Sequence, residues 1–386
     1  MARSSGTAAI RFLHTADWQL GMTRHFLDED AQPRYTAARI EAIAAMGRVI
    51  AERGCEFVVV CGDVFESNLL GARLVRRALE AMAELAVPVY LLPGNHDPFD
   101  AASVYRSPVF AEHRPANVTV LERAETVTVR AGVELVAAPW FGKVPRQDLV
   151  AQAVAQLAPD PATTRILVGH GCADVLSADP ANRAVIGTPG LVEALDAGLL
   201  DYVALGDRHS TTRVADRAIW YSGTPEATDY DEVDPGNVLV VAIDPDRRVE
   251  VESVPIGTWR FADLNRRLGG DDDLAAFEVE LERRRGKDRT ALRLSLTGTL
   301  SLAQQLRLDE LLDRQREVYA AIEVWGKRSE LSVVVDPREL TDLGVGGFAA
   351  DAVAELVELT ATGGEDAAAA RDALSLMYRL TRRGAA

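Results

Sequence analysis

Short apolar runs alternate with amphipathic helical stretches over the first two thirds of the chain. The run Cys55–Cys61 (CEFVVVC) has the near-continuous apolar character of a strand that is covered on both faces. Before it, residues 35–54 carry apolar side chains at helical spacing and end in Gly54, a residue typical of a helix C-terminus. This order predicts an α/β fold, a layered sheet sandwich flanked by helices, rather than a helix bundle or a barrel.

The pattern changes near Pro255. From there to Pro337, helical stretches alternate with strand-like runs again, which predicts a second, smaller α/β unit. Beyond that unit the chain is rich in alanine, glycine and glutamate, with amphipathic stretches at 349–359 and 367–381 that would suit docking helices. The parts expected are residues 1–254, 255–338 and 339–386.

The composition limits the partners and the compartment. The 386 residues carry a formal net charge of -16, which opposes non-specific attraction to nucleic acid, so a polyanion site needs a local basic patch or bound cations. The densest basic run, Arg283–Arg289, would either track a DNA backbone or form a solvated helix end. Three cysteines occur without zinc spacing, and no apolar run approaches the ~20 residues of a membrane span. We therefore expect a cytoplasmic protein with no membrane partner.

Five apolar runs each end in a small polar motif. The motifs are Asp17-Trp18-Gln19, Gly62-Asp63, Gly94-Asn95-His96-Asp97, Gly169-His170 and Gly206-Asp207-Arg208-His209. One such motif after a strand is usually only a turn, whereas five in succession indicate a common site, because loops at the carboxyl ends of strands gather in one crevice. The side chains expected to meet there are Asp17, Gln19, Asp63, Asn95, His170, Asp207 and His209. Their oxygen and imidazole donors suit Mn²⁺, Mg²⁺, Fe or Zn²⁺ rather than a soft metal.

This succession resembles the signature of the calcineurin-like metallophosphoesterases, which is Asp-x-His, Gly-Asp, Gly-Asn-His-(Asp/Glu), Gly-His and Gly-His-x-His. The segments HTADWQLG, CGDVFES, PGNHD and DYVALGDRH, the last followed by WYSGTPEATDYDE, are most similar to the SbcD-type DNA repair exonucleases. The resemblance covers residues 10–244 and reaches residues 255–336 only as a similar small capping domain. It implies a two-sheet metallophosphoesterase sandwich flanked by helices, with an α/β capping domain and a helical C-terminal tail.

The resemblance also implies a centre for two divalent metal ions. The ligands implied for the first ion are Asp17, Gln19, Asp63 and His209. Those implied for the second ion are Asp63, Asn95, His170 and Asp207. Asp63 would bridge the two ions, because a carboxylate can give one oxygen to each.

Two catalytic roles follow from the same resemblance. His96 would contact the phosphate and stabilise or protonate the leaving oxygen. Asp97 would orient the His96 imidazole.

The chain departs from the family pattern at two ligand positions, since Gln19 and Asp207 stand where the family has histidines. More anionic oxygen favours harder cations, so we expect Mn²⁺, with Mg²⁺ as the alternative, over Zn²⁺ and Fe²⁺. Gln19 is a weaker ligand than histidine, and activity would fall or metal preference would change. Glu66 is either part of the site or an ordinary polar surface residue. Arg208 would meet either a phosphate or a neighbouring carboxylate such as Asp207.

The function implied is a metal-dependent DNA nuclease that works in DNA repair with an SbcC-type ATPase. Exonuclease and endonuclease action both stay open. The alternatives are a small-molecule phosphodiesterase or phosphatase of the same fold, and a weakly active or non-catalytic DNA-binding subunit. Family members pair through the helices after the second and third metal loops, here near Leu69–Leu85 and Ala101–Arg114, so a homodimer is expected.

Overall fold

The computed structural model describes residues 9–177, 184–334 and 347–362, together with a few positions between 366 and 377. The chain divides into two compact units. The first contains the described residues up to His25 together with Gln32–Trp259, and the second contains Phe26–Ala31 together with the described residues from Arg260 onward. Among the described residues, no helix combines the length and the apolar character that crossing a membrane requires.

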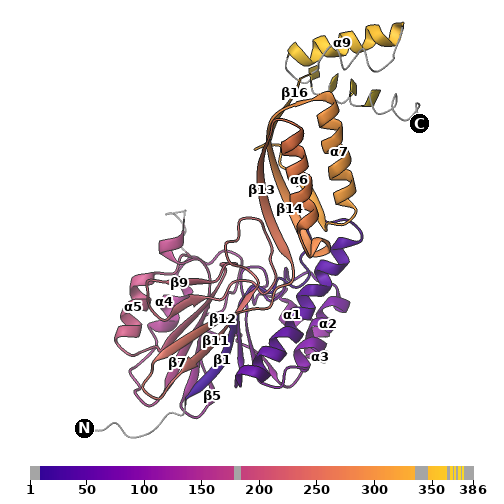
Figure 1. The fold of residues 1–386 in the computed structure, drawn as a ribbon. Helices are drawn as coiled ribbons and strands as arrows, with labels where there is room; N and C mark the ends of the chain where they lie inside the picture. Colours follow the sequence, from indigo (N-terminus) through magenta and orange to yellow (C-terminus); the bar gives the residue numbers. More distant parts are fainter. Residues whose placement is uncertain are drawn as a thin grey trace. The chain divides into compact units, whose positions relative to one another are not determined.

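Two six-stranded sheets form the centre of the first unit (Figure 1). In spatial order the first sheet contains β12 (Val249–Pro255), β11 (Asn237–Ile243), β1 (Ile10–Thr15), β2 (Val58–Cys61), β3 (Val89–Leu92) and β4 (Val118–Val120). The second contains β5 (Thr126–Arg130), β6 (Val133–Ala137), β7 (Thr164–His170), β8 (Tyr202–Gly206), β10 (Ile219–Tyr221) and β9 (Thr212–Val214). Strands β1 to β4 run parallel, and so do β6, β7, β8 and β10. The carboxyl ends of the central strands therefore share one edge in each sheet.

Each sheet buries its two faces differently. The facing surfaces of the two sheets form one apolar core that includes Phe12, Phe57 and Tyr202. The outer face of the first sheet packs against α1 (Ala31–Arg53), α2 (Ala72–Ala83) and α3 (Pro108–His113). The outer face of the second sheet packs against α4 (Leu149–Val154) and α5 (Thr188–Asp196). The expected two-sheet α/β sandwich flanked by helices is confirmed.

A buried histidine links the two sheets close to their carboxyl edges. The His14 Nδ1 atom of β1 lies 3.0 Å from the Tyr202 hydroxyl of β8, and its Nε2 atom lies 3.2 Å from the Leu205 carbonyl oxygen. Burial lowers the pKa of His14 to about 3, so the imidazole is neutral. The residue is structural, and it fixes the distance between the strands that carry the polar loops.

The second unit is a smaller α/β layer. Strand β14 (Thr290–Ser301) pairs in parallel with β13 (Arg260–Leu268), β15 (Ala321–Val324) and β16 (Glu330–Val334). Helices α6 (Asp271–Arg283) and α7 (Leu302–Arg316) share an apolar core with this sheet, and α9 (Phe348–Thr362) packs against α7. Much of the stretch 367–381, expected to be helical, lies outside the described residues.

The boundary between the units lies between Trp259 and Arg260. Strand β12, which ends at Pro255, pairs with β11 along its whole length and so belongs to the first unit. The three-part division at residues 254 and 338 stays a prediction.

Candidate metal centre

The five polar motifs lie at the carboxyl ends of β1, β2, β3, β7 and β8, in the last residues of a strand or in the loop that follows it. Asp17, Asp63 and His170, which come from three of these loops, each offer a ligand atom within 4.8 Å of the others, and all three side chains are buried. Two of the loops belong to the first sheet and one to the second. The centre therefore spans the edge of the sandwich.

Asp63 occupies the middle of the centre. Its Oδ1 atom accepts a hydrogen bond from the His96 backbone N–H at 2.9 Å, and its Oδ2 atom accepts one from Gln19 Nε2 at 3.1 Å. The Nε2 atom of His170 lies 3.4 Å from Asp63 Oδ1. One carboxylate is thus oriented by two loops and faces a third, which is the arrangement that a bridging ligand needs.

His170 is held in one orientation. Its Nδ1 atom lies 2.8 Å from the Cys61 carbonyl oxygen, and its Nε2 atom lies 2.7 Å from Asn95 Oδ1. Since a carbonyl only accepts, Nδ1 carries hydrogen and Nε2 faces the centre, as a metal-binding imidazole requires. Burial alone would lower the pKa of His170, but the nearby carboxylates of Asp63 and Asp207 outweigh it and raise that pKa.

Asp17 and Gln19 place buried oxygen atoms without partners at the other side of Asp63. Both residues have positive φ angles, 54° and 48°, which turn the loop after β1 back towards β2. Asp17 Oδ1 and Gln19 Oε1 are buried without a hydrogen-bond partner. Burial, reinforced by Asp63 and Asp207, raises the pKa of Asp17 well above its usual value. Unpartnered buried oxygens and crowded carboxylates are costly unless a cation compensates them, so the residues present fit a divalent metal.

Asp207 and His209 complete this side. The Asp207 backbone N–H donates to Asp17 Oδ2 at 3.2 Å, and Asp207 Oδ1 lies 3.6 Å from His170 Nε2. His209 Nε2 lies 4.0 Å from Asp17 Oδ1. All seven predicted ligand residues thus come together around one centre, and their individual roles as metal ligands stay predictions.

The loops can approach this closely because two positions lack a side chain. A Cβ atom at Gly62 would overlap the His170 ring, and one at Gly94 would overlap the Asp63 carboxylate. Gly62 also has a φ of 88°, which a residue with a side chain rarely adopts.

Sequence reasoning missed Glu232. Its Oε1 atom lies 3.0 Å from His209 Nδ1, and its Oε2 atom accepts a hydrogen bond from the Thr228 backbone N–H at 2.9 Å. The Thr228 hydroxyl lies 2.6 Å from the same His209 nitrogen. A carboxylate on the outer nitrogen fixes the tautomer of a metal-binding histidine. The available signal was an acidic residue ending the segment that follows the last histidine motif.

The expected role of Asp97 is wrong in one respect. Its carboxylate accepts hydrogen bonds from the Gly94 and Phe65 backbone N–H groups and from the Tyr105 hydroxyl, at 2.8, 3.0 and 2.6 Å. The His96 Nδ1 atom instead lies 2.9 Å from the Glu66 carbonyl oxygen. Asp97 therefore ties together the loops that carry Asp63 and Asn95 and does not orient the imidazole. Burial and the charge of Asp63 raise the pKa of Asp97 to about 6.

Glu66 and Arg208 now have defined surroundings. Glu66 Oε1 lies 3.8 Å from His96 Nδ1, its Oε2 atom is buried without a partner, and burial raises its pKa. Glu66 is therefore part of the centre's edge rather than an ordinary surface residue. Arg208 donates from Nε to the Thr212 hydroxyl at 2.8 Å, which is neither of the two partners expected for it.

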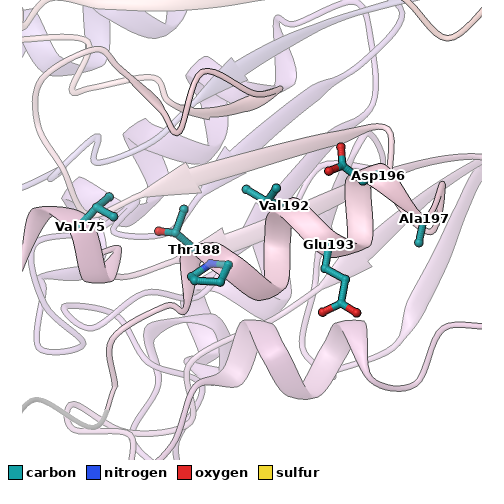
Figure 2. Close-up of a pocket in the computed structure, with 7 residues that line it drawn as sticks. Val175, Thr188, Val192, Glu193, Asp196 and Ala197 are labelled. Atoms are coloured by element: carbon teal, nitrogen blue, oxygen red, sulfur yellow. The ribbon is translucent and has the colours of Figure 1, made fainter.

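Two hollows differ in what they could hold. One of about 290 Å³ adjoins the centre, and its lining includes Cys172, Asp207, Arg208, His209 and Glu232. A larger one of about 610 Å³ lies over α5 and is lined by Val175, Thr188, Pro189, Val192, Glu193, Asp196 and Ala197 (Figure 2). Its lining is largely apolar and includes none of the seven predicted ligands. The larger hollow is therefore separate from the metal centre.

A model of the calcineurin-like phosphoesterase family matches residues 10–210, just over half of the chain. The chain belongs to this family. The matched residues contain all five polar motifs. The match confirms the expected phosphoesterase class and fold, and members of this family use divalent metal ions.

More specific relatives match over a shorter stretch. The chain is 33% identical over 91 residues to the DNA double-strand break repair protein Mre11 of Methanococcus maripaludis, covering 23% of each chain. It is 33% identical over 94 residues to a subunit of the nuclease SbcCD from Rhodobacter capsulatus, covering 23% of this chain and 22% of that one. The alignments span less than a quarter of the length of these curated relatives.

The solved structures that align with this chain are more distant in sequence. The protein TT1561 of Thermus thermophilus aligns with a TM-score of 0.40 and 12% identity, over 64% of this chain and 99% of that one. A purple acid phosphatase from yellow lupin seeds aligns with a TM-score of 0.39 and 10% identity, over 65% of this chain and 52% of that one.

Proposed function

We propose that this phosphoesterase is a metal-dependent DNA nuclease of the SbcD type. The observation that carries the proposal is the buried Asp63 carboxylate, flanked by unpartnered oxygens of Asp17 and Gln19 on one side and by His170 on the other. The names of the relatives, a DNA double-strand break repair protein and a nuclease subunit, support DNA as the substrate.

Two divalent cations would bind around Asp63. The first would be held by Asp17, Gln19, Asp63 and His209. The second would be held by Asp63, Asn95, His170 and Asp207. When bound, the cations would supply Lewis acidity for the phosphoryl oxygens and for the attacking water. The predominance of oxygen donors favours Mn²⁺, with Mg²⁺ as the alternative.

His96 is the residue proposed to transfer the proton. Its side chain is 38% exposed, so a substrate can reach it, and its Nε2 atom lies 3.9 Å from Asp63 Oδ2. The Glu66 carbonyl accepts from Nδ1–H, which leaves Nε2 to exchange a proton with the leaving oxygen. Asp97 would act as a positioning residue through the loops it joins.

Assembly is part of the proposal. An SbcC-type ATPase would be the partner subunit, and a homodimer would form through α2, α3 and the loop that carries the exposed Leu69. Light scattering at micromolar concentration should give the dimer mass, and Leu69→Asp should lower it. A monomer in the unsubstituted protein would refute the dimer.

The runner-up is a phosphodiesterase for small esters, which the modest hollow beside the centre favours. We would compare Mn²⁺-stimulated degradation of labelled DNA with hydrolysis of bis(p-nitrophenyl) phosphate, each repeated with Asp63→Ala. A nuclease degrades DNA, and Asp63→Ala abolishes the activity. Hydrolysis of the small ester alone would support the runner-up, and neither activity would support a non-catalytic subunit.

A further inference from the structure

A loop beside the metal centre carries an exposed aromatic ring and two cations. Residues 141–147 lie in the connection between β6 and α4. Phe141 is 48% exposed and Val144 is 83% exposed, and the side chains of Lys143 and Arg146 are also exposed. In the described part of the chain, no carboxylate lies within ion-pair distance of Lys143 or Arg146. The loop 141–147 is therefore locally basic in a chain whose net charge is -16.

The residue before this loop is fixed to two of the ligand loops. The Trp140 backbone N–H donates to the Pro93 carbonyl oxygen at 3.1 Å, and its indole Nε1–H donates to the His170 carbonyl oxygen at 2.7 Å. The Trp140 carbonyl accepts from the Phe99 N–H at 2.8 Å. The loop 141–147 therefore begins directly beside the segments that carry Asn95 and His170.

A third cation lies on the same side. The Arg106 guanidinium stacks over the Phe99 ring at 4.3 Å from its centroid, and the side chain is exposed. No ion pair to Arg106 occurs among the residues that the structure describes. The Phe99 N–H in turn donates to the Trp140 carbonyl oxygen, so Arg106 is linked through Phe99 and Trp140 to the start of the loop 141–147. Arg106, Phe141, Lys143 and Arg146 are called the basic rim below.

The wall of the centre beside Asp207 and His209 is acidic. The hollow of about 290 Å³ is lined there by Asp207, Asp229, Asp231 and Glu232, with Arg208 as its single cation. A polyanionic strand would be repelled from this wall and attracted by the basic rim.

We propose that the basic rim (Arg106, Phe141, Lys143 and Arg146) is the surface over which a nucleic-acid strand reaches the metal centre. The three cations would contact backbone phosphates, and Phe141 would stack on an unpaired base. The inference rests on the proposed nuclease function and specifies the path of its substrate. The basic run Arg283–Arg289 is a weaker candidate, because Arg284 pairs with Glu280 and Lys287 bonds to Gln315 within the second unit.

Binding of fluorescein-labelled single-stranded and duplex DNA, followed by anisotropy in EDTA over a salt series, tests the rim without turnover. The variants are the double substitution Lys143→Glu/Arg146→Glu and the single substitution Phe141→Ala. The control is Arg48→Glu, because Arg48 is exposed on α1, close to the opposite edge of the sheets. Thermal unfolding of every variant verifies the fold.

We expect the double substitution to weaken the binding of both DNAs at least tenfold. The slope of log affinity against log salt concentration should fall by about 0.7–0.9 for each phosphate that is no longer neutralised. Arg48→Glu should leave both unchanged, and Phe141→Ala should weaken single-stranded DNA more than duplex. Unchanged binding by the double variant, or an equal loss in Arg48→Glu, would overturn the rim. Equal losses for both DNAs in Phe141→Ala would overturn the stacking role.

The proposed function is judged separately. Hydrolysis of bis(p-nitrophenyl) phosphate by the unsubstituted protein with Mn²⁺ reports on the centre and does not involve a strand. Absence of DNA degradation alongside rim-dependent DNA binding would reject the nuclease and keep the rim. DNA degradation together with DNA binding that does not depend on the rim would support the nuclease and reject the rim.

Discussion

The two sides of the metal centre differ in how their polar atoms are satisfied. On one side, His170 Nδ1 donates to the Cys61 carbonyl oxygen, and His170 Nε2 lies 2.7 Å from Asn95 Oδ1. On the other side, Asp17 and Gln19 each bury an oxygen that has no partner. On the first side, the hydrogen bond to Cys61 orients the imidazole without a cation. The second side, which contains the Gln19 departure from the family pattern, depends on a cation to offset its buried oxygens.

Asp63 is the one residue shared by both sides, so its removal gives the largest expected effect. Asp63→Ala should abolish binding of both divalent ions and all phosphodiester cleavage. Calorimetry with Mn²⁺ measures the number of ions bound. Asp63→Asn, which keeps the shape and can still accept the His96 N–H, is the matched variant that separates charge from packing. One intact site in Asp63→Ala would show that the two sides are independent.

Substitution of His96 tests whether catalysis can be lost while metal binding is kept on both sides of the centre. His96→Ala should lower phosphodiester cleavage by roughly 10²–10⁴-fold, the usual range for a positioned acid, because the proton donor is lost. Metal binding should be unchanged, since the hydrogen bond to Asp63 comes from the backbone of residue 96. Unchanged turnover would remove His96 from the mechanism, and lost metal binding would make it part of the centre's framework.

Substitution of Glu232 should lower metal affinity only on the side of the centre that contains Asp17, Gln19 and His209. Glu232→Gln removes the negative charge beside His209 Nδ1, and loss of such a partner typically lowers metal affinity by about 10–100-fold. Competition with a chelating dye measures the affinity, and the ¹⁵N shifts of the His209 ring report its tautomer. Asp231→Asn is the control, because it removes the same charge one residue away. Equal losses in both variants would indicate a general charge effect rather than a specific contact.

The convergence of the five motifs could be predicted, because parallel strands present their carboxyl ends at one edge and each motif directly follows an apolar run. The contacts of Asp97 and Glu232 could not. Asp97 adjoins His96 in sequence, yet its carboxylate turns towards Phe65 and Tyr105, which belong to other segments. Glu232 reaches His209 across a loop whose course depends on the packing of β10 and β11. Such contacts depend on how distant segments pack in the tertiary structure, and the hydrophobic periodicity of a sequence does not specify that packing.

The substituted ligands should give the smallest effects and the sharpest comparison of the two sides. Gln19→His should tighten the first ion whatever its identity, because imidazole is the stronger donor and the buried Gln19 Oε1 has no competing partner. Asp207→His removes a negative charge and adds a softer nitrogen. Relative affinity should therefore move from Mg²⁺ and Mn²⁺ towards Zn²⁺, Co²⁺ and Ni²⁺.

Both changes should be smaller than the loss in Glu232→Gln, since each leaves the remaining ligands in place. Titrations of metal binding and of activity with Mn²⁺ and Zn²⁺ measure them. Asp246→His, in the exposed turn between β11 and β12, controls for an added imidazole. If neither side chain binds an ion, the curves for all three variants will superimpose on those of the unsubstituted protein. That result would leave His209 and the carboxylates of Asp17 and Asp63 as the first ion's protein ligands, and the cation dependence of this side would rest on Asp17 alone.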